Sequence, residues 1–355
     1  MAYSSITKSS LHFNTKLYTG NNTAIGSGGN AITGVGFQPD FTWIKRRVSD
    51  AAHHAIYDVV RGTTKQISTS QTNVESTESE GLTAFGADGF TVGNLGRVNE
   101  AGGDTYVSWN WKAGGAGSAN AVGDINSTVS ANTTAGFSIV TYTGNSSTSQ
   151  TVGHGLGVKP SVLWIKRRTG GAESWLYWVD TDFDGTSDIR MLLSGTQANY
   201  NNHPVTFQTT TFTLPSTNDT AWNSSDPYVA YCFAEIKGFS KFGKYDATGT
   251  SNDGPFIYTG FKPAWVLIKR YNSTENWYLF DNKRDTTMNP VETVLYPNLN
   301  NTDGSLTNGI DLLSNGFKVQ SSNTAVGAGD NYTYMAFAAE PLVANVGQGI
   351  PATAI

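Results

Sequence analysis

One pattern of residues occurs three times along this chain, and it limits the fold more than any other feature of the sequence. Each copy has a proline, then a mostly apolar run, then Ile-Lys-Arg. The three prolines are Pro39, Pro160 and Pro263. A landmark that recurs in this way indicates that the chain is built from similar structural units.

Other landmarks recur in the same order around each proline. A turn of the Tyr-Thr-Gly kind precedes it, and an aromatic segment ending in Asp follows it, which matches Asp58, Asp180 and Asp281. Each copy closes with a Tyr and, five residues later, a large aromatic residue. These closing pairs are Tyr106 and Trp111, Tyr228 and Phe233, and Tyr332 and Phe337. Several landmarks in a fixed order are far more specific than any single motif.

The landmarks divide the chain into units of about 100 residues, a normal size for a β-sandwich. The expected parts are an N-terminal arm (1–11), a first unit (12–117), a linker (118–135), a second unit (136–241), a third unit (242–343) and a C-terminal tail (344–355). Gly, Ser, Ala and Asn dominate the linker, which indicates a flexible or irregular segment. We therefore expect the second and third units to pack directly together and the first to be more independent.

The spacing of apolar residues within the units has a period of two, which is typical of strands. Tyr228, Ala230 and Cys232, for example, alternate with residues that face the opposite way. The run after each proline is nearly continuously apolar, so we expect a strand buried on both faces. The predicted fold class is all-β, with three tandem antiparallel β-sandwich repeats of the jelly-roll or lectin-like kind.

The composition excludes several classes of protein. Charged residues are only 14%, aromatic residues are 12%, and there are 39 glycines. Coiled coils and disordered chains have different compositions. The net charge of −5 argues against a nucleic-acid-binding surface. An apolar membrane span and a signal peptide are both missing from the sequence, so we expect no membrane insertion and synthesis in a cytoplasm.

An acidic segment of the second unit resembles the front of a calcium-binding loop. Asp180, Asp182, Asp184 and Asp188 take the ligand positions, and Gly185 takes the turn position. Met191 stands where the loop needs a bidentate Glu, so a solvated acidic turn is the alternative. The other two units place Arg61 and Arg284 after their Asp, which predicts Asp–Arg pairs within those turns.

Tryptophans beside the predicted loops are candidates for stacking on sugar rings. They are Trp175, Trp178, Trp222 and Trp277. The alternative is that they belong to the core, where large aromatic residues usually lie.

Catalytic motifs are missing from the sequence. It contains no His-Glu-x-x-His, no Gly-x-Ser-x-Gly, no P-loop and no Cys/His cluster. We expect a protein that is not an enzyme and that needs no cofactor, calcium at the acidic segment excepted.

Several segments resemble a family of repeat-containing virion proteins of tailed bacteriophages, especially aquatic ones, often described as tail-fibre-like or as domains of unknown function. The segments are 14–20, 33–41, 152–157, 239–243 and 313–317. The resemblance extends over residues 12–343 and lies in structural motifs. It implies a virion location and carries no catalytic residues.

The resemblance implies a structural protein of the virion surface, on the tail or the capsid exterior, made in the host cytoplasm. The expected role is a tail-fibre or surface-fibre component that takes part in particle assembly and host attachment. Alternatives are a capsid decoration protein and a lectin-like module that binds host glycans. The expected partners are other virion proteins, further copies of the chain in a trimer, and host surface glycans, but not nucleic acid.

Overall fold

The structure is a computed structural model that describes residues 4–48, 51–100, 102–180, 189–199, 203–285 and 289–341. In these residues the regular structure is β-strand, apart from two 3₁₀ turns, η1 (Ser9–Leu11) and η2 (Ile25–Ser27). All strand pairs in the sheets are antiparallel. The described segments include no helix with the length and apolar character needed to cross a membrane.

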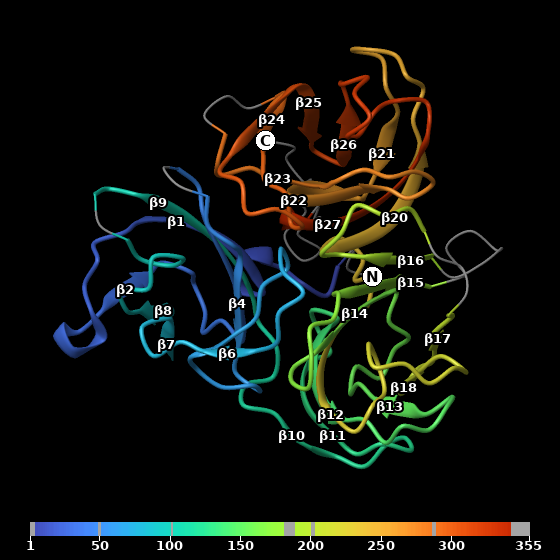
Figure 1. The fold of residues 1–355 in the computed structure, drawn as a ribbon. Coiled ribbons are helices and arrows are strands. Elements are labelled where there is room, and N and C mark those ends of the chain that lie inside the picture. The colour runs from blue at the N-terminus through green and yellow to red at the C-terminus, as the bar shows by residue number, and fades with distance from the viewer. Residues whose placement is uncertain are drawn as a thin grey trace.

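Three large sheets carry the architecture, and Figure 1 shows them as groups that run from blue to teal, from teal-green to yellow and from yellow to red. The first sheet has the order β1 (Phe13–Thr19), β9 (Thr105–Trp111), β3 (Phe41–Arg46), β4 (Ala55–Asp58). The second has the order β10 (Ser118–Asn120), β11 (Ser127–Asn132), β12 (Phe137–Thr143), β19 (Pro227–Phe233), β14 (Val162–Arg167), β15 (Leu176–Val179), β16 (Ile189–Leu192). The third has the order β20 (Ser240–Asp246), β27 (Asn331–Pro341), β22 (Phe261–Arg270), β23 (Trp277–Asp281).

The same strand order occurs in all three large sheets. The apolar run after each proline forms the central strands β3, β14 and β22. Each central strand lies between the strand that closes its unit (β9, β19 or β27) and the strand that follows it in the chain (β4, β15 or β23). In the third sheet Pro263 lies within β22 at a register shift, where a strand tolerates a missing N–H. The all-β antiparallel class is confirmed, while the boundaries of the three units stay predictions.

A smaller sheet covers the outer face of each large sheet. The first is β2 (Asn30–Thr33), β8 (Gly89–Val92) and β7 (Leu82–Gly86); the second is β13 (Thr151–Gly153), β18 (Thr211–Thr213) and β17 (Thr206–Phe207); the third is β21 (Phe256–Tyr258), β26 (Gly316–Val319), β25 (Gly304–Leu313) and β24 (Val291–Val294). A two-stranded ribbon, β5 (Lys65–Gln66) with β6 (Ser76–Thr77), lies beside β4. Because the central strands are covered on this side as well, their continuous apolar sequence is explained.

The inner faces of the three large sheets pack on one common core. The closing strands β9, β19 and β27 contribute matching positions in layers, and these residues are all buried. The layers are Trp111, Phe233 and Phe337; then Trp109, Tyr231 and Met335; then Val107, Val229 and Thr333. Phe337 contacts the rings of both other members of its layer, with centroids 5.5 Å from Trp111 and 6.1 Å from Phe233.

The shared core corrects the expectation that the first unit is more independent. Its Trp43 packs edge-to-face on Trp164 of the second sheet, at 5.9 Å between ring centroids. Its Trp111 packs in the same way on Trp265 of the third sheet, at 5.6 Å. The first sheet therefore contacts both of the others, and the three sheets form a closed ring around the core (Figure 1).

The segment predicted as a linker is also ordered. Residues 118–135 contain β10 and β11, which extend the second sheet beyond β12. Their Ser, Thr, Ala and Asn side chains suit a strand at a half-exposed sheet edge, so a composition typical of linkers did not exclude strand pairing here.

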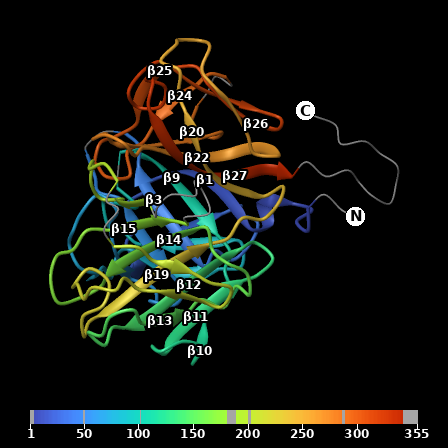
Figure 2. The ribbon, with the colours of Figure 1, turned by 90° about the vertical axis from the view of Figure 1, so that its right-hand side faces the viewer.

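The N-terminal arm is not a free polar segment either. From Ser4 on it is described, and Ile6 is 1% exposed and part of the common core. The turn η1 lies beside the end of β27, so both described ends of the chain lie at one side of the molecule (Figure 2). The predicted tail, 344–355, lies outside the described residues.

Candidate functional site: the seams between the sheets

The three large sheets meet at three seams, which we name first–second, second–third and third–first. At each seam, the last residue of β4, β15 or β23 pairs with the start of the central strand of its own sheet and faces the neighbouring sheet. These residues are Asp58, Val179 and Asp281. Val179, and not Asp180, therefore matches Asp58 and Asp281, which corrects the alignment expected from the sequence by one residue.

A buried ion pair lies at the first–second seam. Nε of Arg61 donates to Oδ2 of Asp58 over 2.5 Å, and both side chains are 0% exposed. The hydroxyl of Tyr231, which belongs to the second sheet, donates to the same carboxylate oxygen over 2.7 Å. Backbone N–H groups of Val60 and Arg61 donate to Oδ1. Because four donors surround it, the carboxylate is stable without water.

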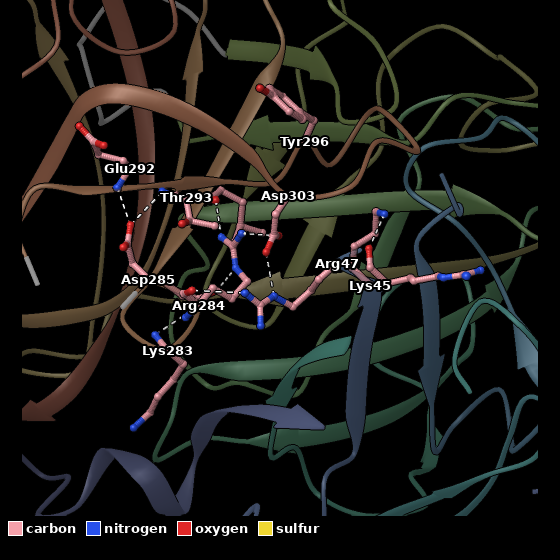
Figure 3. Close-up of polar contacts among 12 residues, drawn as sticks. Lys45, Arg47, Lys283, Arg284, Asp285, Glu292, Thr293, Tyr296 and Asp303 are labelled. Carbon is pink, nitrogen blue, oxygen red and sulfur yellow. Dashed lines mark hydrogen bonds and ion pairs between the residues drawn. The ribbon is translucent and has the colours of Figure 1, made fainter. Parts of the chain in front are cut away.

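The third–first seam repeats this arrangement with different residues (Figure 3). Nε of Arg284 donates to Oδ2 of Asp281 over 2.6 Å, again with both side chains fully buried. The donor from the neighbouring sheet is now the indole Nε1 of Trp109, at 3.0 Å. Trp109 and Tyr231 occupy matching positions of β9 and β19, so two different polar aromatic residues perform the same task.

A second carboxylate links each arginine across its seam. At the first–second seam, Glu75 accepts from Arg61 at 3.1 Å and from Arg168 of the second sheet at 2.9 Å. Burial raises the pKa of Glu75, but the bond from Arg168 and the charge of Arg61 outweigh it and hold this pKa below its usual value.

Asp303 has the corresponding place at the third–first seam. It accepts from Arg284 at 3.1 Å and from Arg47 of the first sheet at 2.8 Å. Figure 3 shows its carboxylate between the two guanidinium groups. Each of the two ionic seams is thus a chain of alternating charges that joins one sheet to the next.

The second–third seam differs in its charges. Val179 takes the place of the buried Asp, Met335 takes the place of Trp109 and Tyr231, and Tyr271 follows the Lys-Arg pair where the other sheets have a second Arg. The rings of Tyr177 and Trp277 pack across this seam with centroids 4.9 Å apart. One backbone bond is common to all three seams. The N–H groups of Glu75 and Asp303 donate to the carbonyls of Arg168 and Arg47, both over 2.9 Å, and here the Asn199 N–H donates to the Tyr271 carbonyl over 2.7 Å.

A buried lysine is the next-to-last residue of the central strand in each sheet, and it bonds to a backbone carbonyl in a loop of the neighbouring sheet. Lys45 donates to Asn300 at 3.3 Å, Lys166 to Thr72 at 2.8 Å and Lys269 to Thr196 at 3.2 Å. Burial lowers the pKa of Lys45 to about 7 and the pKa values of Lys166 and Lys269 to about 8. The Lys-Arg end of the apolar run is therefore part of the seams.

The four candidate sugar-stacking tryptophans lie in the interior. Trp175, Trp178, Trp222 and Trp277 are each at most 1% exposed. Trp175 and Trp277 belong to seams, where their indole N–H groups donate to Ser68 and Leu192 carbonyls at 2.7 and 2.9 Å. Trp178 and Trp222 contact each other in the outer core of the second sheet. Their ring faces are covered by protein, so the glycan contacts expected at these residues are not available.

The acidic segment can be placed only at its first residue. Asp180 forms an ion pair with Lys159 at 2.7 Å. Asp182, Asp184 and Asp188 lie outside the described residues, so the predicted calcium loop stays a prediction. Within the described ranges, no group of three or more His, Cys, Asp or Glu side chains is arranged to hold a metal ion.

The predicted Asp–Arg turn pairs are confirmed at Asp58 and Asp281, but their partners across the seams were not predicted. Glu75 and Asp303 come from loops that carry no repeated landmark, so only the folded arrangement brings them to the arginines. Chemically, the seams hold charges in fixed, buried positions, which suits the joining of subunit-like parts.

Comparison with known proteins places the chain in a family without assigning it an activity. No curated protein and no solved structure matches it. A family model described as a domain of unknown function (DUF7483) matches residues 8–341, which include all three large sheets and all three seams. The chain therefore belongs to the DUF7483 family of domains of unknown function.

Proposed function

We propose that this protein is a non-enzymatic structural component of a bacteriophage virion surface, in a tail fibre or surface fibre, with a role in assembly and host attachment. The observation that carries the proposal is the use of the buried ionisable groups. The buried ion pairs of Asp58 and Asp281 with their arginines link the sheets to one another. A chain whose buried charged groups stabilise contacts between its own sheets is suited to a load-bearing or display role.

The arrangement of the chain ends also supports an attached module. The N-terminal turn η1 and the end of β27 lie together at one side of the molecule (Figure 2). A partner that grips this side leaves the loops at the other side free for further contacts. The phage assignment itself rests on the resemblance of the repeated segments.

A density map of intact particles, combined with peptide mass spectrometry, tests the proposal. We expect the chain in purified virions, with tens of copies or fewer for a fibre and hundreds for a capsid decoration, the alternative location. Absence from purified particles that infect normally would overturn the virion assignment. Release of reducing sugar from host polysaccharide by the purified protein would overturn the non-enzymatic assignment.

The homotrimer implied by the resemblance belongs to the same proposal. A ring of three similar sheets is already present within one chain (Figure 1). Light scattering of the purified protein separates the alternatives, because one chain has a mass of 38.0 kDa and a trimer has three times that mass. A trimer in solution would have a threefold axis between chains in addition to the threefold arrangement of sheets within each chain. A monomer would have only the arrangement within the chain.

A further inference from the structure

A polar groove opens beside the first–second seam. It has a volume of about 620 Å³, within the range of about 300–1,000 Å³ that is usual for small-molecule sites. The ribbon strand β5 and the loop after it form one wall, and the 170–172 turn of the second sheet forms the other. The loop is anchored by Glu75, which the two arginines of the seam hold in place. The groove therefore has a fixed frame.

The groups that line this groove include donors with no partner among the residues that the structure describes. Gln66 is 2% exposed, and its Oε1 accepts from the Tyr57 hydroxyl at 2.8 Å. Its amide N–H₂ group has no acceptor among the described residues. Arg97 and Gln71 also line the groove, and in the described ranges neither side chain forms a hydrogen bond or an ion pair. Because these donors line the groove and are unused within the described residues, a ligand in the groove can accept hydrogen bonds from them.

The charges and the remaining lining select the kind of ligand. Glu78 offers a carboxylate and Arg97 a guanidinium, while the charge of Glu75 is already met by Arg61 and Arg168. The groove thus presents one negative and one positive side chain, so its net charge from these two groups is zero. Val74, 37% exposed, adds an apolar contact. Planar amides, a carboxylate and a guanidinium beside a small apolar patch match the paired hydroxyls and C–H face of a sugar ring.

We propose that this groove binds a neutral saccharide through Gln66, Gln71, Glu78 and Arg97. Amide and guanidinium N–H groups donate to ring hydroxyl oxygens, and the Glu78 carboxylate accepts from a hydroxyl. This inference deepens the attachment role proposed above and rests on it for the source of the sugar, which is a host cell surface. It also moves the glycan contact from buried tryptophans to polar side chains that line a groove.

An array of oligosaccharides tests the proposal with the purified full-length chain. The probes are neutral oligomers of glucose, galactose, mannose and N-acetylglucosamine, together with sialylated and uronate-containing ones. We expect binding to at least one neutral probe, and calorimetry with that probe then gives its affinity. Arg97→Ala and Gln71→Ala are each expected to weaken binding about tenfold, because each removes hydrogen bonds to the ligand.

Gln197→Ala is the matched control. Gln197 is an exposed residue of the corresponding loop at the second–third seam, adjacent to Thr196, which accepts from Lys269 as Thr72 does from Lys166. It should leave the affinity unchanged, and the melting temperatures of all variants check that they fold. If Arg97→Ala fails to fold, Arg97→Gln and Gln71→Ala carry the test.

Three results would overturn the proposal: no neutral probe bound, binding only to acidic probes, or affinities that both groove variants leave unchanged. The outcome is separable from that of the virion assignment. Arg97→Ala should enter particles normally if the chain is a virion component, and sugar binding by the purified chain does not depend on its presence in virions.

Discussion

The two ionic seams have a buried Asp–Arg pair, and the second–third seam, where Val179 replaces the Asp, joins similar sheets without one. Asp58 and Asp281 are each buried against an arginine and a polar aromatic residue of the next sheet, whereas Val179 occupies the matching position of the third joint. Buried ion pairs often add little net stability over apolar packing, and their best-attested use is in fixing register. Since three similar sheets in one chain could be joined in more than one order, distinct seams would specify a single order.

The largest expected effect comes from the aromatic core that all seams share. Trp164 is 0% exposed and contacts Trp43, Tyr177 and Phe233. We predict that Trp164→Ala lowers the free energy of unfolding by about 3–5 kcal/mol, because it leaves a large cavity. Urea unfolding measures the loss. A value below about 1 kcal/mol would mean that the core tolerates the cavity and that the seams carry more of the stability than we infer.

Breaking a single ionic seam is expected to cost slightly less. Asp58→Ala leaves Arg61 buried with only Glu75 as its charged partner, and we predict a loss of about 3 kcal/mol. The double variant Asp58→Val, Arg61→Met copies the apolar character of the second–third seam and should recover part of this loss.

The difference between these two variants distinguishes a requirement for charge from a requirement for pairing. If the double variant is no more stable than Asp58→Ala, the seam depends on its charges. If Asp58→Ala itself costs less than about 1 kcal/mol, the buried pair contributes little, and the contrast between the seams has no energetic meaning.

The lysine at the third–first seam predicts a dependence of stability on pH. Burial lowers the pKa of Lys45 to about 7, whereas the unfolded chain keeps the usual value near 10.5. Between these values the unfolded state binds more protons, so stability rises with pH, and this gain is lost progressively as pH falls from about 10.5 to about 7. We predict a contribution of about 1–2 kcal/mol between pH 7 and 9.

Lys45→Met isolates this contribution, since it keeps the side-chain stem and removes the titrating group. Urea midpoints at pH 7, 8 and 9 should rise less steeply in the variant than in the parent chain. Burial also raises the pKa of Cys232 to about 12, so ionisation of this thiol in the unfolded chain begins to act near pH 9, but variant and parent share it and it cancels in the comparison. Equal slopes for variant and parent would mean that Lys45 stays charged in the fold.

The sequence predicted the parts of this fold that depend on local pattern. The repeated apolar runs become β3, β14 and β22, and the Asp–Arg turns form as expected because their partners are near in sequence. The offset of Asp180 could not be seen, because register is set by pairing with Val162 rather than by the nearest acidic residue. The shift of one residue moves the carboxylate from a buried position to a half-buried one, where it pairs with Lys159.

The sequence left two interpretations of the tryptophans open, stacking on sugars and burial in the core, and the structure places them in the core. Proximity to predicted loops suggested exposure, but at the seams the loops of one sheet cover the strands of the next. The indole N–H groups of Trp175 and Trp277 donate to the carbonyls of Ser68 and Leu192, which are far from them in sequence. A closed ring of sheets leaves no signal in the spacing of residues within one unit, so the seams and the groove beside them required the structure.

The smallest expected effect concerns the arginine that the second–third seam lacks. Arg168→Tyr places at the first–second seam the residue type that Tyr271 supplies at the second–third seam. Glu75 keeps Arg61, and the Arg168 side chain is 19% exposed, so we predict a loss of about 1 kcal/mol in the free energy of unfolding at pH 7.

The contribution of this ion pair depends on pH. Burial raises the pKa of Glu75, but the bond from Arg168 and the charge of Arg61 outweigh it and lower this pKa in the folded protein. The pair therefore stabilises the fold above the pKa that Glu75 has in the unfolded chain, and this stabilisation is lost as pH falls through the pKa of Glu75 in the fold. The gap between variant and parent should therefore shrink in acid, and unfolding at pH 7 and pH 3.5 measures it. A difference that stays constant would show that Arg168 acts through the packing of its aliphatic stem. Tyr271 and Arg168 would then fill the same space at their seams, and the seams would differ only at the buried Asp positions.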